Sequence, residues 1–120
     1  MSNKTGPDLI AEAKERIREI SAADAVKLCA ARPDVVMLDV REPNEYAMAH
    51  VAGAVLLPRG HLEGRVEAMI PRDRTVVIYC ARGNRSALAA DTMQQIGYGD
   101  VYSLAGGFGS WMDAGGEVED

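Results

Sequence analysis

Short, almost continuously apolar segments constrain the fold of this chain most strongly. Three of them are "DVVMLDV" (34–40), "TVVIY" (75–79) and "DVYSL" (100–104), and "VAGAVLLP" (51–58) is a further short apolar run. Apolar runs of this length that carry β-branched residues are typical of strands covered on both faces. We therefore expect a sheet that is shielded by helices on both of its sides.

Segments with helical patterning alternate with these apolar runs. Leu9, Ala13 and Ile17 fall on one face of the first segment, and Ser21 is a suitable N-cap for the second. The expected helices span residues 8–18, 21–31, a short stretch from Pro43, 60–70, 86–97 and 106–116. This alternation predicts an α/β domain with a central, mainly parallel sheet flanked by helices on both faces.

Length and charge exclude several classes of protein. The 120 residues fit one domain, and the net charge of −5 argues against nucleic acid or an anionic membrane as the main partner. No window is apolar enough to span a bilayer, and the polar N-terminus does not resemble a secretory signal. The two cysteines do not suggest a disulfide scaffold, so we expect free thiols and a cytoplasmic location.

One of the cysteines, Cys80, occupies an unusual position. It follows the apolar run 75–79 directly and begins the segment "CARGNRS", which leads into the helix expected over 86–97 with Ser86 as its N-cap. In parallel α/β sheets, ligands bind outside the carboxyl ends of the strands. A cysteine becomes nucleophilic as the thiolate, which a helix N-terminus and nearby cations stabilise. We therefore interpret Cys80 as a reactive thiol and not as a buried structural cysteine.

The residues that follow Cys80 suit an anionic ligand. Arg82 and Arg85 can complement a dianion, and Gly83 gives the backbone the freedom to curl. Free backbone amides at the start of the helix can converge on the sulfur and on an anion bound beside it. The predicted binding loop therefore comprises Ala81, Arg82, Gly83, Asn84 and Arg85.

The sequence resembles the rhodanese-like family from about Ile20 onward. The resembling pieces are "VVMLDVREPNEYAMAHVAGAVLLP", "VVIYCARGNRS" and "LAGGFGSWMDAGGEVE", in the order and at the spacing of the family. The resemblance implies a sulfurtransferase in which Cys80 carries sulfur as a persulfide and residues 81–85 cradle the anion. It also implies a small anionic sulfur donor such as thiosulfate and an acceptor that is a thiol, cyanide or a protein. Neither a cofactor nor a metal is expected, since the histidines and cysteines lack metal-ligand spacing.

Loop length separates two chemistries within this resemblance. Sulfur-transferring members have six residues from the cysteine to the last loop residue, as Cys80 to Arg85 does here. The related dual-specificity phosphatases have one residue more, with a histidine before the cysteine and an arginine six positions after it. Tyr79 and Ser86 occupy those positions here, so phosphate-ester chemistry is disfavoured.

Asp39 and Arg41 are further candidates for the site because they end the run 34–40. The resemblance implies that Arg41 adds positive field beside the loop and that Asp39 orders it. The alternative is an ion pair that only holds a turn.

The N-terminal segment is expected to be an amphipathic extension over residues 1–19, before a rhodanese-like domain over 20–120. It could contact a partner protein or a second copy of the chain. The alternative function is accordingly a dedicated persulfide carrier or interaction module with little turnover of its own.

Overall fold

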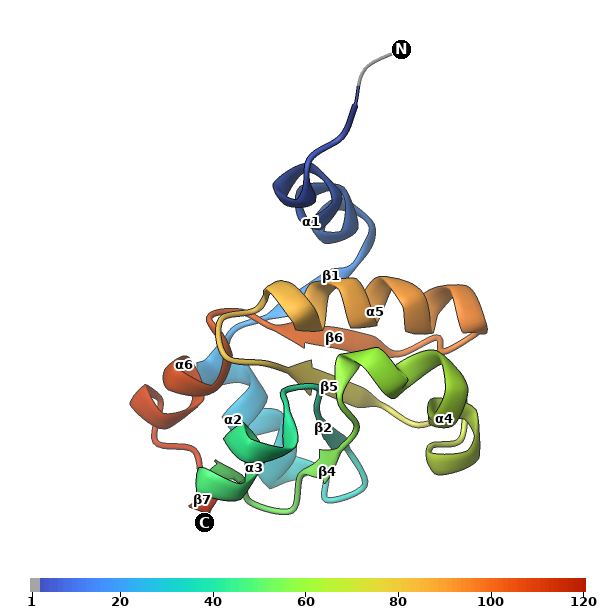
Figure 1. The fold of residues 1–120 in the computed structure, drawn as a ribbon. Coiled ribbons are helices and arrows are strands. Elements are labelled where there is room, and N and C mark those ends of the chain that lie inside the picture. Colours follow the sequence, from blue (N-terminus) through green and yellow to red (C-terminus); the bar gives the residue numbers. More distant parts are fainter. Residues whose placement is uncertain (1–2) are drawn as a thin grey trace.

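The protein folds around one parallel sheet. A computed structural model describes residues 3–120, and its central sheet has the strand order β1-β6-β5-β2-β4 (Figure 1). The strands are β1 (Arg18–Ile20), β2 (Val36–Asp39), β4 (Val55–Leu56), β5 (Val76–Tyr79) and β6 (Val101–Leu104). Away from this sheet, β3 (His50–Val51) and β7 (Val118–Glu119) form a small antiparallel pair.

Helices surround the central sheet on both sides, as the alternating pattern predicted. They are α1 (Gly6–Arg16), α2 (Ala22–Ala31), α3 (Pro43–Met48), α4 (Leu62–Met69), α5 (Asn84–Ile96) and α6 (Gly107–Asp113), with a 3-10 turn, η1 (Arg59–His61). Side chains of α4 and α5 form one core with one face of the sheet, and those of α2 and α6 form a second core with the other. The predicted α/β class with a parallel sheet is therefore confirmed.

The middle strand, β5, shows how the sequence pattern builds both cores. Val76 and Ile78 point to the α4 and α5 side, whereas Val77 and Tyr79 point to the α2 and α6 side. Successive side chains of a strand alternate between faces, so a strand buried on both sides is apolar throughout. The next residue, Cys80, continues the alternation and lies on the α5 side.

The N-terminal segment differs from the prediction of a helix over 8–18. The helix ends at Arg16, Ile17 is extended, and β1 then pairs with the edge of β6, with Ile20 opposite Leu104. If the helix continued, the backbone N–H and C=O groups along this edge of β6 would stay unpaired. Pairing with β1 satisfies them. The predicted boundary between an extension over 1–19 and a domain over 20–120 falls inside β1, and this division of the chain stays a prediction.

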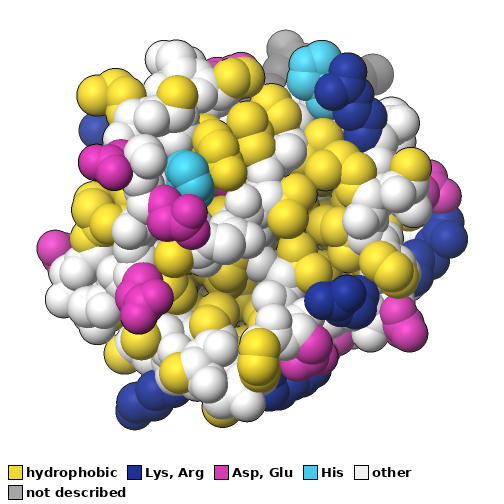
Figure 2. Space-filling model, turned by 90° about the horizontal axis from the view of Figure 1, so that it is seen from below, with side chains coloured by type: hydrophobic (Ala, Val, Ile, Leu, Met, Phe, Trp, Pro, Cys, Tyr) yellow, Lys and Arg dark blue, Asp and Glu magenta, His cyan; other side chains and the backbone are white. Residues whose placement is uncertain are grey.

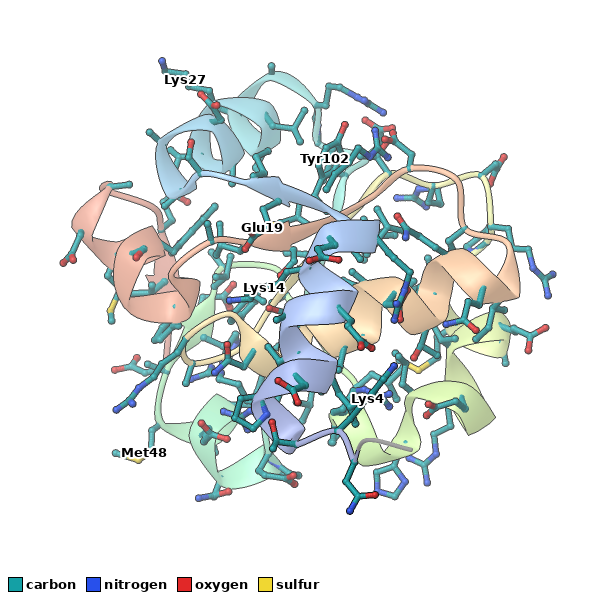
Figure 3. All side chains as sticks on the ribbon, turned by 90° about the horizontal axis from the view of Figure 1, so that it is seen from above. Lys4, Lys14, Glu19, Lys27, Met48 and Tyr102 are labelled. Atoms are coloured by element: carbon teal, nitrogen blue, oxygen red, sulfur yellow. The ribbon has the colours of Figure 1, made fainter. Side chains whose placement is uncertain are left out.

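Helix α1 lies across α5, as the view from above shows (Figure 3). Ala13 is fully buried in this contact, and Arg16 binds Asp91 of α5 through two hydrogen bonds of 3.0 and 2.8 Å. Gln94 of α5 also donates to the Arg16 carbonyl. The amphipathic helix is therefore laid against the domain. No helix within residues 3–120 is both long and apolar enough to cross a membrane.

Candidate active site

Cys80 lies at the carboxyl end of the central strand β5 and is only 1% exposed. Its sulfur accepts backbone hydrogen bonds from Gly83, at 3.0 Å, and from Ser86, at 3.4 Å. These amides are available because the first N–H groups of a helix have no partner within the helix. The loop after β5 therefore curls around the sulfur and directs donors at it, as the position of Cys80 predicted.

The start of α5 corrects one expectation from the sequence. Ser86 is not the N-cap, because the helix begins at Asn84 and Gly83 occupies the cap position with a φ of +100°. Glycine adopts this left-handed conformation without steric cost, so the cap lies three residues earlier than expected. Ser86 thus lies in the first turn and points inward, with its Oγ 3.4 Å from the Cys80 sulfur and 2.8 Å from Ser103 Oγ of β6.

These contacts determine the ionisation of the thiol. Burial by itself raises the pKa of Cys80, because a thiolate loses its hydration there. The Ser86 hydroxyl and the backbone amides of Ser86, Arg82 and Gly83 oppose this effect, and the pKa lies below that of an ordinary cysteine. A lowered pKa increases the fraction of Cys80 that is present as the nucleophilic thiolate at a given pH.

Above the sulfur is an open hollow of about 320 Å³, lined by Cys80, Ala81, Arg82, Asn84 and Arg85. The structure thus brings together the predicted nucleophile and four of the five predicted loop residues. The fifth, Gly83, contributes its amide to the sulfur from below. Within residues 3–120, the Arg82 side chain is exposed and makes no ion pair, so its charge faces solvent and any incoming anion.

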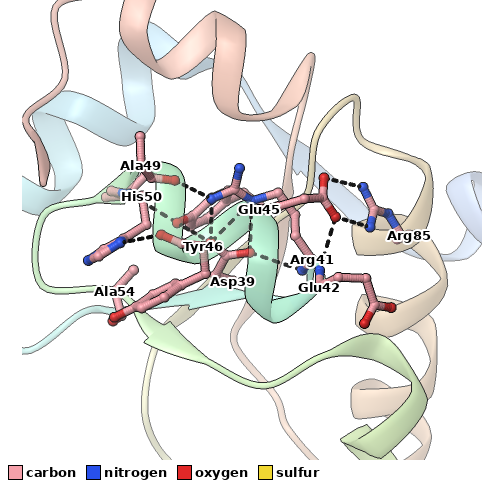
Figure 4. Close-up of polar contacts among 11 residues, drawn as sticks. Asp39, Arg41, Glu42, Glu45, Tyr46, Ala49, His50, Ala54 and Arg85 are labelled. Atoms are coloured by element: carbon pink, nitrogen blue, oxygen red, sulfur yellow. Dashed lines mark hydrogen bonds and ion pairs between the residues drawn. The ribbon is translucent and has the colours of Figure 1, made fainter. Parts of the chain in front are cut away.

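Arg85, in contrast, is bound to a carboxylate. Its guanidinium contacts both oxygens of Glu45 on α3, at 2.8 and 3.2 Å (Figure 4). The hydrogen bond from Arg85 lowers the pKa of Glu45 to about 2. From the sequence, Glu45 is expected to order the neighbouring loops or to be solvated, and no local signal marks a pairing between residues 40 positions apart. The net positive charge at the hollow is therefore smaller than the two arginines of the loop suggest.

Asp39 and Arg41 form a buried pair beside the loop. The Arg41 guanidinium binds Asp39 at 3.0 and 2.8 Å and donates to the Ala49 carbonyl at 2.7 Å (Figure 4). The Tyr79 hydroxyl donates to Asp39 at 2.7 Å and accepts from the Val51 amide at 3.0 Å. These bonds connect the ends of β2 and β5 to β3. This arrangement matches the alternative in which the Asp39–Arg41 ion pair holds a turn. Neither side chain lines the hollow, and a direct role in substrate binding stays a prediction.

The start of α6 supports the loop from behind, which sequence reasoning missed. The Phe108 amide donates to the Cys80 carbonyl at 2.9 Å, and Gly107 packs so closely that a Cβ there would lie 2.6 Å from that oxygen. The double glycine at 106–107 was the available signal, because adjacent glycines often mark a close approach between backbones.

The second cysteine belongs to a different part of the molecule. Cys29 packs with the core on the α2 and α6 side. On the molecular surface, apolar side chains gather near the middle of the face seen from below (Figure 2). It borders a hollow of about 330 Å³ with Met37 and Trp111. Burial raises the pKa of Cys29. Both cysteines are free, and they lie on opposite faces of the sheet.

Comparison with known proteins agrees with this arrangement. The sequence matches the family described as rhodanese-like domain over residues 21–114. A sulfurtransferase from Allochromatium vinosum is 38% identical over 99 residues, covering 82% of this chain and 92% of that protein. The thiosulfate sulfurtransferase GlpE of Pseudoalteromonas translucida is 33% identical over 99 residues, covering 81% and 90%. The chain spans only 20% of the "Probable adenylyltransferase/sulfurtransferase MoeZ" of Mycobacterium tuberculosis, which is 38% identical over 78 residues.

Solved structures include similar folds. A protein of unknown function from Rhodopseudomonas palustris, described as a possible tyrosine phosphatase, superposes with a TM-score of 0.88 at 36% identity. The match covers 99% of this chain and 97% of that one, so it includes α1. A thiosulfate sulfurtransferase from Pseudomonas aeruginosa superposes with a TM-score of 0.76 at 35% identity, over 85% of this chain and 20% of that one. The chain therefore belongs to the rhodanese-like domain family, the family of the sulfurtransferases that it matches.

Proposed function

We propose that this protein transfers sulfane sulfur from thiosulfate or a similar anionic donor to a thiophilic acceptor, through a persulfide on Cys80. The observation that carries the proposal is the buried Cys80 sulfur, held by three hydrogen-bond contacts from Gly83 and Ser86 below an open hollow. The lowered pKa of Cys80 favours the thiolate, and the hollow offers space for a small donor. The names of the relatives support the same class of chemistry.

The first half-reaction loads the protein with sulfur. The Cys80 thiolate attacks the outer sulfur of thiosulfate, and a new S–S bond forms on Sγ. The S–S bond of thiosulfate breaks, and sulfite leaves with the bonding electron pair. Arg82 stands at the mouth, where its charge can stabilise the dianionic donor and the departing sulfite. Amides of the loop are oriented before the donor arrives, so little reorganisation is required.

The second half-reaction returns the thiolate. An acceptor such as cyanide or a thiolate attacks the outer sulfur of the persulfide, and the S–S bond breaks. The electron pair goes back to Sγ, where the contacts from Ser86 and Gly83 stabilise the negative charge again. No proton needs to be removed when both nucleophiles are anions, which is consistent with a hollow lined without a histidine.

Intact mass measurement tests the loading step. The protein is exposed to thiosulfate, desalted and weighed, and we expect a gain of one sulfur atom in the wild type and in Cys29→Ser. Cys80→Ser should gain none. A gain that is retained in Cys80→Ser, or an absence of gain in the wild type, would contradict the proposal.

A thiocyanate assay then distinguishes a catalyst from a carrier. Steady thiocyanate production from thiosulfate and cyanide, abolished in Cys80→Ser, is expected for a catalyst. Loading that is followed by release only to a thiol or protein acceptor would favour the dedicated carrier. This chain matches only 20% of MoeZ, and the name of that relative gives it an adenylyltransferase activity as well. A related domain there stands beside another activity in one chain, which makes the carrier worth testing here.

A second candidate is hydrolysis of phosphate esters, which only the description of the Rhodopseudomonas palustris protein favours. The six-residue loop from Cys80 to Arg85 argues against it, because a phosphate needs a wider ring of amides.

A further inference from the structure

A chain of buried polar groups leads away from the Cys80 sulfur into the core. Ser86 Oγ lies 3.4 Å from Sγ, and Ser103 Oγ lies 2.8 Å from Ser86 Oγ. Both serines are fully buried, and the three groups come from three elements, namely the end of β5, the first turn of α5 and the strand β6. A buried hydroxyl must place its proton on an acceptor or lose the free energy of that hydrogen bond.

The direction of the bonds in this chain depends on the charge of the sulfur. Within residues 3–120, Ser86 Oγ is the one hydrogen-bond partner of Ser103 Oγ, so Ser103 satisfies its proton only by donating to Ser86. The Ser86 proton is then directed at Sγ. In the reverse direction, a Cys80 thiol donates to Ser86 and Ser86 donates to Ser103, which leaves the Ser103 proton without an acceptor. The first direction fits a sulfur anion, and the second fits a protonated thiol.

We propose that Ser103 is a positioning residue, whose hydroxyl fixes the direction of the Ser86 hydroxyl so that Ser86 donates to the Cys80 sulfur anion. Ser103 does not contact the sulfur itself and acts only through Ser86. Two aligned hydroxyls polarise one another, which strengthens the bond that reaches the sulfur. The pair favours the thiolate in the resting protein. It favours the thiolate again when an acceptor takes the outer sulfur, a consequence that rests on the proposed function.

The charged groups around the thiol are few and can be held constant in a test. Arg82 and Arg85 face Cys80 from the loop and the start of α5, and Glu45 of α3 is bound to Arg85. Strand β6 contributes Ser103, and the start of α6 contributes the Phe108 amide, which bonds the Cys80 carbonyl. A change at Ser103 therefore removes a dipole beside the thiol without removing a charge.

The test is the pH dependence of Cys80 alkylation by iodoacetamide, measured in the Cys29→Ser background so that one thiol reacts. Ser103→Ala should move the midpoint upward by about 0.5 to 1 pH unit, and the rate below the midpoint should fall about threefold to tenfold. Thr75→Val is the matched control, since it removes another buried hydroxyl at the opposite end of β5. Its midpoint should equal that of the parent.

Ser103→Thr and Ser103→Val form a second pair of variants. Threonine and valine have nearly the same shape, but only threonine keeps the hydroxyl. Threonine should keep the parental midpoint and valine should raise it, so this pair carries the test if the alanine variant does not fold. Ser86→Ala should raise the midpoint alone, and adding Ser103→Ala to it should change nothing more, because the effect of Ser103 passes through Ser86.

An unchanged midpoint in Ser103→Ala, equal midpoints for Thr and Val, or additive effects of the two serines would each overturn the inference. The alkylation needs no sulfur donor, so it is independent of the proposed function. A wild type that gains no sulfur from thiosulfate would refute the sulfurtransferase and leave this result standing.

Discussion

At the scale of single residues, the two arginines of the loop differ in what surrounds them. Arg82 is exposed and unpaired within the described residues, whereas Arg85 is held by Glu45 at 2.8 Å. The first can move to meet an anion. The second is already ordered, and its charge is largely balanced by the carboxylate. Composition treats both as equal donors to a substrate, but their surroundings differ, so we expect the two side chains to act differently.

We expect Arg82→Ala to lower kcat/KM for thiosulfate by roughly fivefold, or about 1 kcal/mol, because an exposed cation is screened by solvent. A neutral organic persulfide donor should lose less. Arg85→Ala should impair both donors to a similar extent, since it frees Glu45 and loosens the loop. Steady-state kinetics with both donors checks this, with the exposed Arg65→Ala on α4 as control. Equal losses from both donors in Arg82→Ala would contradict it.

At the scale of elements, two ion pairs connect helices that no local pattern joins. Glu45 links α3 to α5 through Arg85, and Arg16 links α1 to α5 through Asp91. Asp91 is mostly buried, with its side chain 13% exposed, whereas Arg16 is 56% exposed. The value of such a pair lies partly in avoiding a buried carboxylate without a partner. Removing either ion pair should therefore lower the free energy of unfolding.

Arg16→Gln should lower the free energy of unfolding by more than the loss of an exposed ion pair does, because Asp91 loses its bidentate partner while remaining mostly buried. The matched control is Lys4→Gln, which removes the exposed pair with Glu12 and should cost no more than about 0.5 kcal/mol. Denaturant unfolding measures both. Equal effects of the two variants would mean that α1 contributes little through this contact.

Glu45 makes the stability depend on pH. Its pKa is lowered from 4.5 to about 2 by Arg85, so the stabilisation is complete above pH 4.5 and is lost as the pH falls towards 2. Wild type should exceed Glu45→Gln in unfolding free energy at neutral pH, and the difference should shrink between pH 4.5 and 2. Glu63→Gln, in an exposed pair on α4, is the control and should show little difference at any pH. A constant gap for Glu45→Gln would contradict the linkage.

At the scale of the whole molecule, the fold itself does not decide between sulfur and phosphate. The same sheet superposes on a thiosulfate sulfurtransferase and on a protein described as a possible tyrosine phosphatase. The chemistry depends on the site placed on the fold, above all on the size of the loop around Cys80. Within residues 3–120, the backbone amides of Gly83 and Ser86 bond the Cys80 sulfur, and we expect a tetrahedral phosphate to need more donors than these.

We therefore expect negligible aryl-phosphate hydrolysis by the native protein, because a misplaced phosphorus forfeits several kcal/mol of alignment. Inserting one glycine between Gly83 and Asn84 should weaken sulfur transfer and widen the hollow for phosphate. Phosphate release and thiocyanate formation are measured on the same preparations, with Cys80→Ser as the blank. Robust Cys80-dependent phosphate release without thiocyanate would overturn the sulfurtransferase in favour of the phosphatase.

The sequence by itself determined the α/β class, the place of Cys80 after a buried strand and the residues of its loop. Those features follow from local rules, since side-chain alternation and the strand-to-helix turn act between neighbours along the chain. Tertiary structure alone decided that Arg85 meets Glu45, that Ser86 meets Ser103 and that Gly107 supports the Cys80 carbonyl. Ser86 and Ser103 are 17 residues apart in the sequence, and Glu45 and Arg85 are 40 apart. Such partners come together only when strand register and helix packing are set. The position of Cys80 and the residues of its loop could therefore be predicted from the sequence, but the contacts that Arg85, Ser86 and the Cys80 carbonyl make with other elements could not.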